Sequence, residues 1–392
     1  MFFNKESCNL CGVCFNKCPT MGLPIGEAKE EIKALIDGEK TKRVLTECQT
    51  CFSCNTFCPR DSNPYGLILS RWHEAYKKNG LPEYIRIILP LEKPNFNTIA
   101  QKRLPEDEQR SVRRWEELSR SDMSKKEIFF ASCNTRLVPY ITYTKFLEGM
   151  PIVGSQDMCC GEVYYRMGLF DKVEQNTRKL EKKYMGLKKM TMMCPACYNM
   201  FKNVLPQQFD AKFDFEVEHL LEYLSKRIEN GEIKIKNKTN RVVTVQDSCH
   251  AKVLGPDFME LPRKILGLTG AEMVEMAHCK ESALCCGIGA SAATYSLPNL
   301  LRATLRRWKE ARRTGADYLV VYCNTCLMLM SIAKKIVPSR MQIYHVLEIL
   351  QMSAGEEPLH RHAGRAGQIS RGIVREGFPT FFSRKRFWVD NY

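Results

Sequence analysis

Short apolar runs alternate with amphipathic segments from residue 127 onward. Four of these runs have the length and composition of buried strands: residues 128–130, 190–193, 242–245 and 318–322, the second being the weakest. Between the runs lie helical patterns such as Leu301, Leu305 and Trp308, which mark the inner face of a predicted helix that ends near Gly315. Strands that alternate with helices predict α/β units with mainly parallel pairing.

The first 126 residues follow a different pattern. Two cysteine-rich runs flank a predicted helix at 27–37, and a second helix is predicted at 63–78, where Pro64 suits the first turn. Residues 80–126 are rich in proline and then in mixed charges, which is typical of a linker. One exposed helix is expected in this linker, around Trp115.

The cysteine content changes this picture of an ordinary globular chain. Of 392 residues, 44% are apolar, but 19 are cysteine, an odd number. A secreted disulfide scaffold is usually small, carries an export signal and has an even count. The sequence begins without an apolar signal segment and has no run of roughly 18 apolar residues that would span a membrane. We therefore expect a reduced, cytoplasmic protein whose thiolates bind metal, from an anaerobic organism.

The formal net charge of +15 would normally indicate an acidic partner, an anionic membrane or nucleic acid. If most of the cysteines bind iron as thiolates, the net charge of the loaded protein falls to about +5. The basic residues then largely neutralise buried thiolates. We therefore expect no nucleic-acid partner.

Two cysteine runs before residue 60 have the spacing of a bacterial ferredoxin with two [4Fe–4S] clusters. Three closely spaced cysteines wrap one cubane, and the fourth, which proline follows, binds the other cubane. The predicted ligands are Cys8, Cys11, Cys14 and Cys58 for cluster one, and Cys48, Cys51, Cys54 and Cys18 for cluster two. Zinc also favours paired Cys-x-x-Cys, but this spacing, repeated with its proline, is unusual for zinc.

A second cysteine pattern repeats between residues 127 and 353. Each copy has a strand that ends in a cysteine, a Cys-Cys-Gly sequence, a helix, a second strand and a Cys-x-x-Cys sequence. The first set is Cys133, Cys159, Cys160, Cys194 and Cys197; the second set is Cys249, Cys285, Cys286, Cys323 and Cys326. Five cysteines exceed the four ligands of a cubane or a tetrahedral zinc. A catalytic dithiol, a zinc site and buried structural cysteines are less fitting alternatives.

Two glycines, Gly161 and Gly287, follow the paired cysteines. We predict that they let the backbone approach a bound cofactor closely, because other residues resist such a conformation. Each Cys-x-x-Cys should lie at a strand-to-helix turn, where backbone N–H groups favour anionic sulfur.

With these motifs the chain resembles heterodisulfide-reductase-type proteins, in which a ferredoxin-like C subunit is joined to a B subunit with two cysteine-rich CCG domains. The resemblance covers roughly residues 1–345. It implies two noncubane [4Fe–4S] clusters, one on each set of five cysteines, in addition to the two cubane clusters. The fold it implies is a helical ferredoxin-like domain followed by two repeated α/β CCG domains.

The resemblance also implies a function. The chain would be an oxidoreductase subunit of a larger complex, receiving electrons from a flavin-containing subunit, an electron-transfer flavoprotein or a hydrogenase-type partner. Electrons would pass through the cubane clusters to the noncubane clusters, which reduce a disulfide. The alternative is a non-catalytic conducting subunit of a glycolate, lactate or glycerol-3-phosphate dehydrogenase, or of a benzoyl-coenzyme A reductase complex, exchanging electrons with quinone or ferredoxin. A zinc scaffold is the weakest option.

Several further residues have predicted roles. His250 directly follows a predicted ligand and is our candidate proton donor to departing thiolates; the simpler alternative is a hydrogen bond to a cluster sulfur. Cys279 is expected to be a spare buried thiol, and His278 beside it structural. For Arg166, Lys252 and Lys280, solvated surface charges are expected rather than contacts with an anionic substrate.

The last segment, residues 354–392, is basic and aromatic and is expected outside the core, docking to a partner subunit or touching a membrane surface. Its aromatic residues are Phe378, Phe381, Phe382, Phe387, Trp388 and Tyr392. The predicted domains are thus 1–79 (ferredoxin-like), 80–126 (linker), 127–240 and 241–353 (CCG domains) and 354–392 (docking tail).

Overall fold

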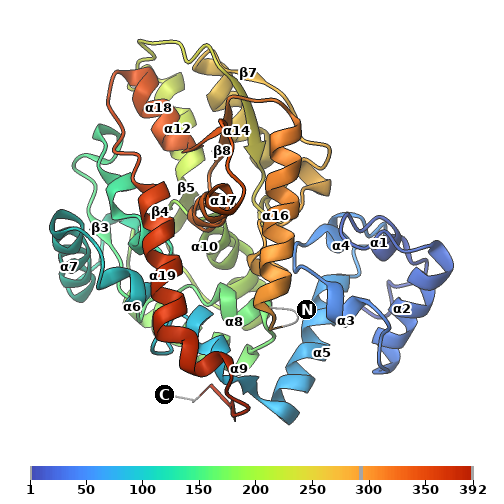
Figure 1. Cartoon of the computed structure of the whole chain (residues 1–392). Helices are drawn as coiled ribbons and strands as arrows, with labels where there is room; N and C mark the ends of the chain where they lie inside the picture. Colours follow the sequence, from blue (N-terminus) through green and yellow to red (C-terminus); the bar gives the residue numbers. More distant parts are fainter. Residues whose placement is uncertain (1, 291–294, 390–392) are drawn as a thin grey trace.

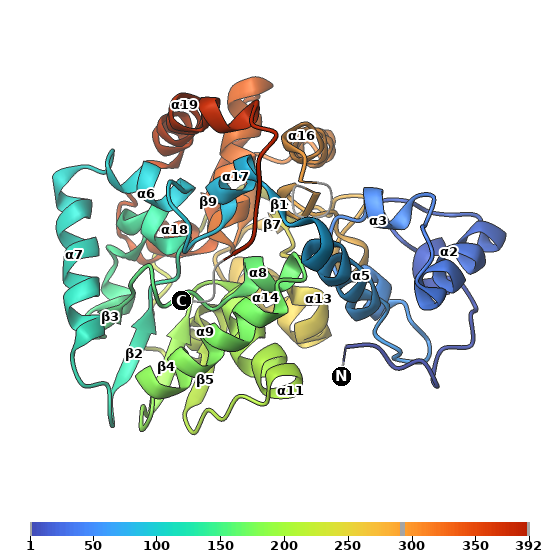
Figure 2. The same cartoon turned by 90° about the horizontal axis from the view of Figure 1, so that it is seen from below.

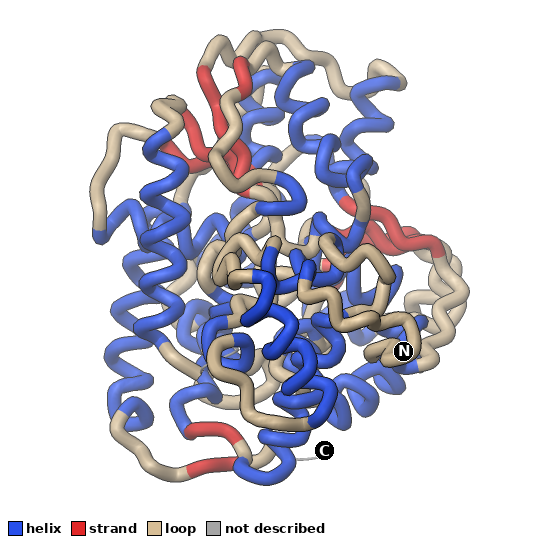
Figure 3. The backbone as a smooth tube through the Cα atoms, turned by 90° about the vertical axis from the view of Figure 1, so that its right-hand side faces the viewer, coloured by secondary structure: helices blue, strands red, loops and turns tan. Residues whose placement is uncertain are grey.

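The chain folds into a helical N-terminal unit beside a larger body built on two parallel sheets (Figure 1). The computed structural model describes residues 2–290 and 295–389. In Figure 1 the N-terminal unit projects to the right of the body, and in Figure 2 it lies opposite helix α7 (Glu106–Arg120). Figure 3 looks onto this unit and shows that its loops contribute as much as its short helices.

The N-terminal unit forms around its cysteine loops. Its helices are α1 (Val13–Asn16), α2 (Ile25–Asp37), α3 (Val44–Glu47), α4 (Ser53–Thr56) and α5 (Pro64–Asn79). Helices α2 and α5 confirm the two predicted helices. Asn63 caps α5 by accepting the N–H of Gly66, with Pro64 at the first helical position as expected. Ala28, Ile32 and Leu35 give α2 a buried face at helical spacing.

Each copy of the repeat folds into a four-stranded, all-parallel sheet, which confirms the predicted α/β fold. The first copy contains β2 (Glu127–Phe130), η2 (Thr135–Leu137), η3 (Pro139–Thr142), η4 (Lys145–Leu147), β3 (Ile152–Val153), α8 (Glu162–Arg166), α9 (Phe170–Lys183), β4 (Lys189–Met192), α10 (Pro195–Asn199), the π-helical η5 (Met200–Val204), α11 (Leu205–Phe209), β5 (Glu216–His219) and α12 (Leu220–Glu229). The strand order is β3-β2-β4-β5.

The second copy repeats this topology with the order β7-β6-β8-β9. It contains β6 (Val242–Gln246), α13 (Ala251–Leu254), α14 (Pro256–Leu268), β7 (Glu272–Met273), η6 (Lys280–Ser282), α16 (Leu297–Arg313), β8 (Tyr318–Val321), α17 (Asn324–Ile336), β9 (Gln342–His345) and α18 (Val346–Ala354). In both sheets the chain turns first to one side of the initial strand and then to the other. The reversal leaves a crevice at the carboxyl ends of β2 and β4, and of β6 and β8, where α/β proteins commonly bind ligands.

The last strand of each sheet leads into a helix capped by histidine. The Nδ1 atoms of His219 and His345 accept the N–H groups of Leu221 and Leu347, and a glutamate three residues on completes each capping box. Burial lowers the pKa of His219 to about 3 and that of His345 to about 4, so both rings are neutral acceptors. This duplicated feature supports descent of the two copies from one unit.

The predicted inner face of α16 was partly wrong. Trp308 is fully buried, but Leu301 is 38% exposed. The buried row instead includes Thr304 and Arg307, whose polar groups donate to the Cys286 carbonyl and to the Gln246 side chain. The prediction considered apolar residues alone and therefore missed the buried polar residues Thr304 and Arg307.

The segment predicted as a linker is packed into the body. It contains β1 (Leu81–Pro82), η1 (Glu83–Ile88), α6 (Phe96–Gln101) and α7. Trp115 is 4% exposed and packs with Val112, Leu104 and Ala131, so the expectation of an exposed helix was wrong for this face. Polar residues cover the other faces of α7, so the sequence as a whole looks polar although it contains a narrow apolar stripe.

The C-terminal segment also belongs to the body, contrary to expectation. Helix α19 (His362–Phe381) packs against α17 and α6, and β10 (Arg386–Phe387) pairs antiparallel with β1. Arg365 donates twice to the fully buried carboxylate of Glu108 on α7, at 2.8 and 2.9 Å, and Arg361 reaches the same carboxylate at 2.9 Å. Basic residues that looked available to a partner therefore neutralise a buried acid of the same chain.

Part of this segment remains exposed. Phe378, Phe382 and Trp388 are exposed by 50% or more, whereas Phe387 is buried under Arg86. Docking to a partner or a membrane surface stays a prediction, and these three aromatic side chains lie in the same segment as the exposed basic residues Arg371, Arg375, Arg384 and Lys385. Tyr392, the last of the predicted docking residues, lies outside the described residues. Within the described ranges, no helix combines the length and the apolar character needed to cross a membrane.

Replacing Glu108 with glutamine should leave the Arg365 guanidinium buried without a counter-charge and weaken the packing of α19 by about 3 kcal/mol. We expect a lower thermal midpoint and faster proteolytic cleavage within α19. Glu106→Gln is the matched control, because Glu106 pairs with Arg110 in solvent on the same helix. Equal behaviour of the two variants would contradict the anchoring role of Glu108.

Candidate functional site

The eight cysteines of the N-terminal unit gather in the two predicted sets. The thiol neighbours of Cys14 include Cys58, Cys11 and Cys8. Those of Cys54 include Cys48, Cys51 and Cys18 from its own predicted set, together with Cys14 of the other set. The fourth cysteine of each run therefore crosses to the other run, as the ferredoxin spacing requires.

Helices α1 and α4 begin in the same unusual way within the two cysteine runs. Each starts after a residue in the left-handed region: Gly12, with φ 73°, before α1 and Phe52, with φ 65°, before α4. Glycine adopts this conformation freely, whereas a bulky aromatic residue does so rarely. The Phe52 ring lies 4.9 Å from the ring of His250, centroid to centroid. The conformation of Phe52 therefore directs an aromatic ring from the ferredoxin-like unit toward the second CCG domain.

The first set of five cysteines meets at the carboxyl edge of the first sheet. Cys133 follows β2 and Cys194 follows β4, two adjacent parallel strands, so both arrive at the same edge. Cys133 contacts the Cys159 thiol, and the Cys160 and Cys197 sulfur atoms are 3.2 Å apart. Four of the five cysteines are buried, and Cys133 is partly exposed.

The second set is arranged in the same way at the edge of the second sheet. Cys249 and Cys323 follow the adjacent strands β6 and β8. The Cys286 thiol interacts with Cys285, Cys326, Cys323 and Cys249. The two sets adjoin: Asn324, beside Cys323, is 3.2 Å from the sulfur atom of Met193, beside Cys194, and these two cysteines influence each other's pKa. The ten cysteines therefore form one group of neighbouring sulfur atoms.

Backbone groups favour anionic sulfur at several of these positions. Cys194 and Cys323 are the residues that precede α10 and α17, as expected of a Cys-x-x-Cys at a strand-to-helix turn. The N–H groups of Gly161 and Gly287 donate to Cys159 and Cys285 Sγ, at 3.5 and 3.4 Å. Hydrogen bonds from Cys285 and Cys326 lower the pKa of Cys286 to about 5, so this sulfur is a thiolate at neutral pH.

The two glycines are required for different reasons. Both have positive φ, 85° at Gly161 and 120° at Gly287. A Cβ atom on Gly287 would lie 2.0 Å from Thr304 Oγ1 on α16, whereas one on Gly161 would make only ordinary contacts. The backbone at Gly287 therefore lies close to helix α16. That these glycines let the backbone approach a cofactor stays a prediction.

Arg166 and Lys252 are buried, so the expectation that they are solvated surface charges was wrong. Arg166, 3% exposed, donates to the Thr50 carbonyl and hydroxyl and contacts Cys249 Sγ at 3.5 Å. Lys252 Nζ donates to the Cys51 carbonyl at 3.1 Å and to the hydroxyl of Ser53 and the carbonyl of Ala283 at 2.7 Å. These two cations fasten the cysteine loop of residues 48–54 to both CCG domains.

His250 lies in this junction. Its Nε2 is 2.9 Å from Glu162 Oε1 and 3.0 Å from the Arg166 guanidinium, and its Nδ1 is 3.3 Å from the Asn199 amide nitrogen. Although burial raises the pKa of Glu162, attraction to Arg166 and His250 holds it at about 2. Both ring nitrogens have protein partners, so proton delivery from His250 requires one of these hydrogen bonds to open.

The remaining predicted residues lie apart from the sulfur group. Cys279 is partly exposed, and its charged neighbours include Glu275, Asp247 and Arg263. His278 contacts Glu310 through Nδ1 at 2.9 Å, which is a structural role. Lys280 pairs with Glu260 near the surface, as a solvated charge should.

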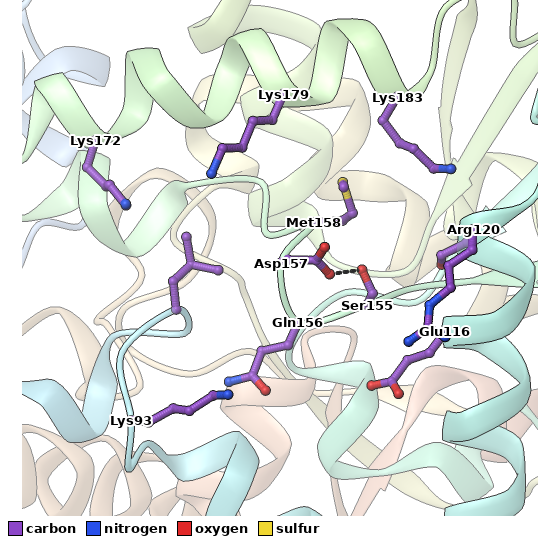
Figure 4. Close-up of a pocket in the computed structure, with 12 residues that line it drawn as sticks. Lys93, Glu116, Arg120, Ser155, Gln156, Asp157, Met158, Lys172, Lys179 and Lys183 are labelled. Carbon is purple, nitrogen blue, oxygen red and sulfur yellow. Dashed lines mark hydrogen bonds between the residues drawn. The ribbon is translucent and has the colours of Figure 1, made fainter. Parts of the chain in front are cut away.

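A cationic pocket of 680 Å³ opens beside the first cysteine set (Figure 4). Its cationic lining residues are Lys93, Arg120, Lys172, Lys179 and Lys183. Three of these lysines project in a row from α9, opposite Lys93 and Arg120, with Asp157 between them. Met158, which precedes Cys159, also lines the pocket. The excess of positive charge suits an anionic ligand.

Sequence reasoning missed Phe52, Arg166 and Lys252 as junction residues. The sequence contained one sign that Phe52 is unusual: Phe52 occupies the position in the second cysteine run that Gly12 occupies in the first. Arg166 has one local partner, Glu162 at i−4, but the residues of the cluster-two loop that Arg166 and Lys252 contact are more than 100 residues away in the chain.

Comparisons with known proteins agree with this arrangement. Residues 1–59 match the 4Fe-4S dicluster domain, and residues 141–202 and 243–331 match the cysteine-rich domain abbreviated CCG. A subunit of the dihydromethanophenazine:CoB–CoM heterodisulfide reductase of Methanosarcina mazei is 27% identical over 399 residues, covering 90% of this chain and 94% of the relative. The probable glycolate oxidase iron-sulfur subunit of Bacillus subtilis is 23% identical with the same coverage. The EtfAB:quinone oxidoreductase of Syntrophomonas wolfei is 26% identical over 50% of this chain and 29% of its own length.

Replacing Lys252 with methionine should loosen the junction by about 3 kcal/mol, since hydrogen bonds from a charged donor are lost and buried carbonyls are left unpaired. We expect faster hydrogen–deuterium exchange in residues 48–56. Lys280→Met is the control, because the partners of Lys280 are at the surface. If exchange in residues 48–56 is the same in both variants, Lys252 does not hold the junction.

Proposed function

Because the chain belongs to the heterodisulfide reductase-like family, which joins a 4Fe–4S dicluster domain to two cysteine-rich domains, we propose that it is an iron–sulfur subunit of a redox complex that reduces an organic disulfide. The observation that carries this proposal is that the two complete sets of five cysteines adjoin, with Asn324, beside Cys323, 3.2 Å from the sulfur atom of Met193, beside Cys194. A relay requires only that each cluster lie near the next. Two adjoining five-thiol sets additionally allow two sulfur atoms of one substrate to be handled together.

The donor sets fit the groups that the proposal requires. Within each set the thiols already interact with one another, and the glycine N–H groups donate toward sulfur. In each copy the five cysteines named above would hold one noncubane [4Fe–4S] cluster. When bound, these clusters would supply single electrons and an iron site for sulfur. The overall reaction is R–S–S–R′ + 2 e⁻ + 2 H⁺ → RSH + R′SH.

The junction supports a direction for electron entry. The cluster-two loop, residues 48–54, contacts Arg166, His250 and Lys252, so cluster two would be the neighbour of the CCG domains. Cys8, Cys11 and Cys58 of cluster one are partly exposed. Cluster one would then accept electrons from the partner, a flavin-containing subunit, an electron-transfer flavoprotein or a hydrogenase-type protein.

The cationic pocket supports an anionic substrate. Five cationic side chains line it, and its floor is one residue from Cys159. A disulfide that carries carboxylate, sulfonate or phosphate groups has the complementary charge. His250 would supply the Nε2 proton once the hydrogen bond from Nε2 to Glu162 opens, while Asn199 holds the ring at Nδ1.

The second candidate function is electron conduction without catalysis. It is favoured by the similarity to an iron–sulfur subunit of glycolate oxidase and to an EtfAB:quinone oxidoreductase. In that case the same clusters would pass electrons onward, and the cationic pocket would bind a partner rather than a disulfide.

Cys286→Ser should remove a ligand of the second noncubane cluster, lower the iron content by about four atoms per chain and abolish disulfide reduction with a reduced viologen dye. The cubane clusters should keep their electron paramagnetic resonance signals. Cys279→Ser is the matched control, since Cys279 lies outside both sets. A wild-type protein that reduces none of a series of anionic disulfides, yet passes electrons from a flavoprotein to a quinone, would establish the second function instead.

His250→Gln should slow disulfide reduction by about 100-fold, the typical contribution of one general acid. The dependence of the rate on pH should differ between the variant and the wild type, because the variant lacks the proton donor. His278→Gln serves as the control, because the His278 ring contacts the structural carboxylate of Glu310 away from the sulfur group. An unchanged pH profile in the His250 variant would remove His250 as the proton donor.

A further inference from the structure

A cluster of two histidines and one glutamate lies where the second CCG domain meets α19. Glu348 comes from the first turn of α18, His360 from the following loop and His362 from the start of α19. One ligand atom from each residue lies within 4.8 Å of the other two. The cluster is separate from the cysteines and from the pocket beside them.

The three facing atoms are buried, yet they lack hydrogen-bond partners within residues 2–290 and 295–389. Glu348 is 1% exposed and His362 is 2% exposed. The atoms concerned are Glu348 Oε1, His360 Nδ1 and His362 Nδ1. Glu348 Oε1 is 3.5 Å from His360 Nδ1 and 3.7 Å from His362 Nδ1, which is beyond a good hydrogen bond. Such atoms are costly to bury unless something else binds them.

The other polar atom of His362 and of Glu348 has a hydrogen-bond partner, which fixes the orientation of these two side chains. His362 Nε2 is 2.7 Å from the Ile343 carbonyl, an acceptor, so Nε2 carries the hydrogen and Nδ1 carries a lone pair. Glu348 Oε2 accepts the His345 N–H at 2.8 Å, which turns Oε1 toward the histidines. Metal-binding histidines are typically held by such a second hydrogen bond.

In the first copy of the repeat, the equivalent carboxylate oxygen has a hydrogen-bond partner. Glu222, the counterpart of Glu348 in the capping box, accepts a hydrogen bond on Oε1 from the Tyr198 hydroxyl at 3.0 Å. Tyr198 follows Cys197, and the corresponding residue after Cys326 is Leu327, which has no hydroxyl. In the second copy the carboxylate oxygen therefore faces two imidazole nitrogens instead of a hydroxyl donor.

The spacing suits a tetrahedral ion. With metal–ligand bonds of about 2.0–2.1 Å, neighbouring ligand atoms on a tetrahedral zinc are roughly 3.3 Å apart. On an octahedral ion with similar bonds they are only about 3.0 Å apart. The observed 3.5 and 3.7 Å are nearer to the tetrahedral value. His360 is 32% exposed at its side chain, so water can fill the fourth position.

We propose that Glu348, His360 and His362 bind one Zn²⁺ ion, which fastens α19 to the second CCG domain. Two imidazole nitrogens and one carboxylate oxygen form a ligand set that zinc commonly takes in proteins. Arg365, the buried cation on α19, is neutralised by Glu108, so the negative charge of Glu348 is left for the ion.

The test measures zinc and iron in the full-length protein, purified anaerobically with its iron and equilibrated with one equivalent of Zn²⁺. His360→Asn removes a ligand while asparagine tolerates the left-handed backbone at this position, where φ is 46°. Glu222→Gln is the control, because it alters the equivalent capping box in the copy where tyrosine binds the carboxylate. X-ray absorption at the zinc edge identifies the ligand type by bond length.

We expect one zinc per chain in the wild type and in Glu222→Gln, with bonds of about 2.0–2.1 Å to nitrogen and oxygen and none near 2.3 Å to sulfur. His360→Asn should lose this zinc with its iron content unchanged, and Zn²⁺ should raise the thermal midpoint of the wild type but not that of His360→Asn. Sulfur ligation, full zinc retention by His360→Asn, iron in place of zinc, or no zinc in the wild type would each overturn the proposal.

Discussion

The crowding of ten cysteine thiols at the facing edges of two parallel sheets is the constraint on which the rest of the structure depends. Parallel strands deliver the residues after β2 and β4, and after β6 and β8, to one edge of each sheet. Although a hydrogen bond from Cys249 lowers it, interaction with Cys286 and burial raise the pKa of Cys285 to about 12, whereas the pKa of Cys286 is lowered to about 5. Metal cations offset the cost of ionising a buried thiol, since metal binding displaces the thiol protons. This balance supports the metal binding proposed for the ten cysteines.

A second constraint is the junction between the ferredoxin-like unit and the CCG domains. Electron transfer needs a fixed short separation, and flexible tethering would not supply it. Arg166 and Lys252 meet this need with buried, charge-assisted hydrogen bonds to the cluster-two loop. Phe52 adds a ring contact to His250 from a conformation that a phenylalanine adopts rarely. Arg166, which joins the domains, also contacts Cys249 Sγ at 3.5 Å.

Local motifs predicted a large part of this architecture. The Cys-x-x-Cys spacings, the doubled Cys-Cys-Gly sequences and the strand runs contain information within a few residues, so the fold class and the gathering of the cysteines were accessible. Interactions between distant residues were not. Glu108 and Arg365 lie 257 residues apart, and this pair converts a supposed docking tail into part of the body. Arg166 was expected to be solvated because the sequence near it shows only Glu162 at i−4, and its buried partner Thr50 lies 116 residues away.

Disulfide reduction at the two sets of five cysteines requires two noncubane clusters in addition to the two cubane clusters. The iron content of the anaerobically purified full-length protein, referred to protein by amino-acid analysis, distinguishes this cluster inventory from a smaller one. We expect about sixteen iron atoms per chain, four for each [4Fe–4S] cluster. About eight iron atoms, enough for the dicluster domain alone, would refute the presence of the noncubane clusters.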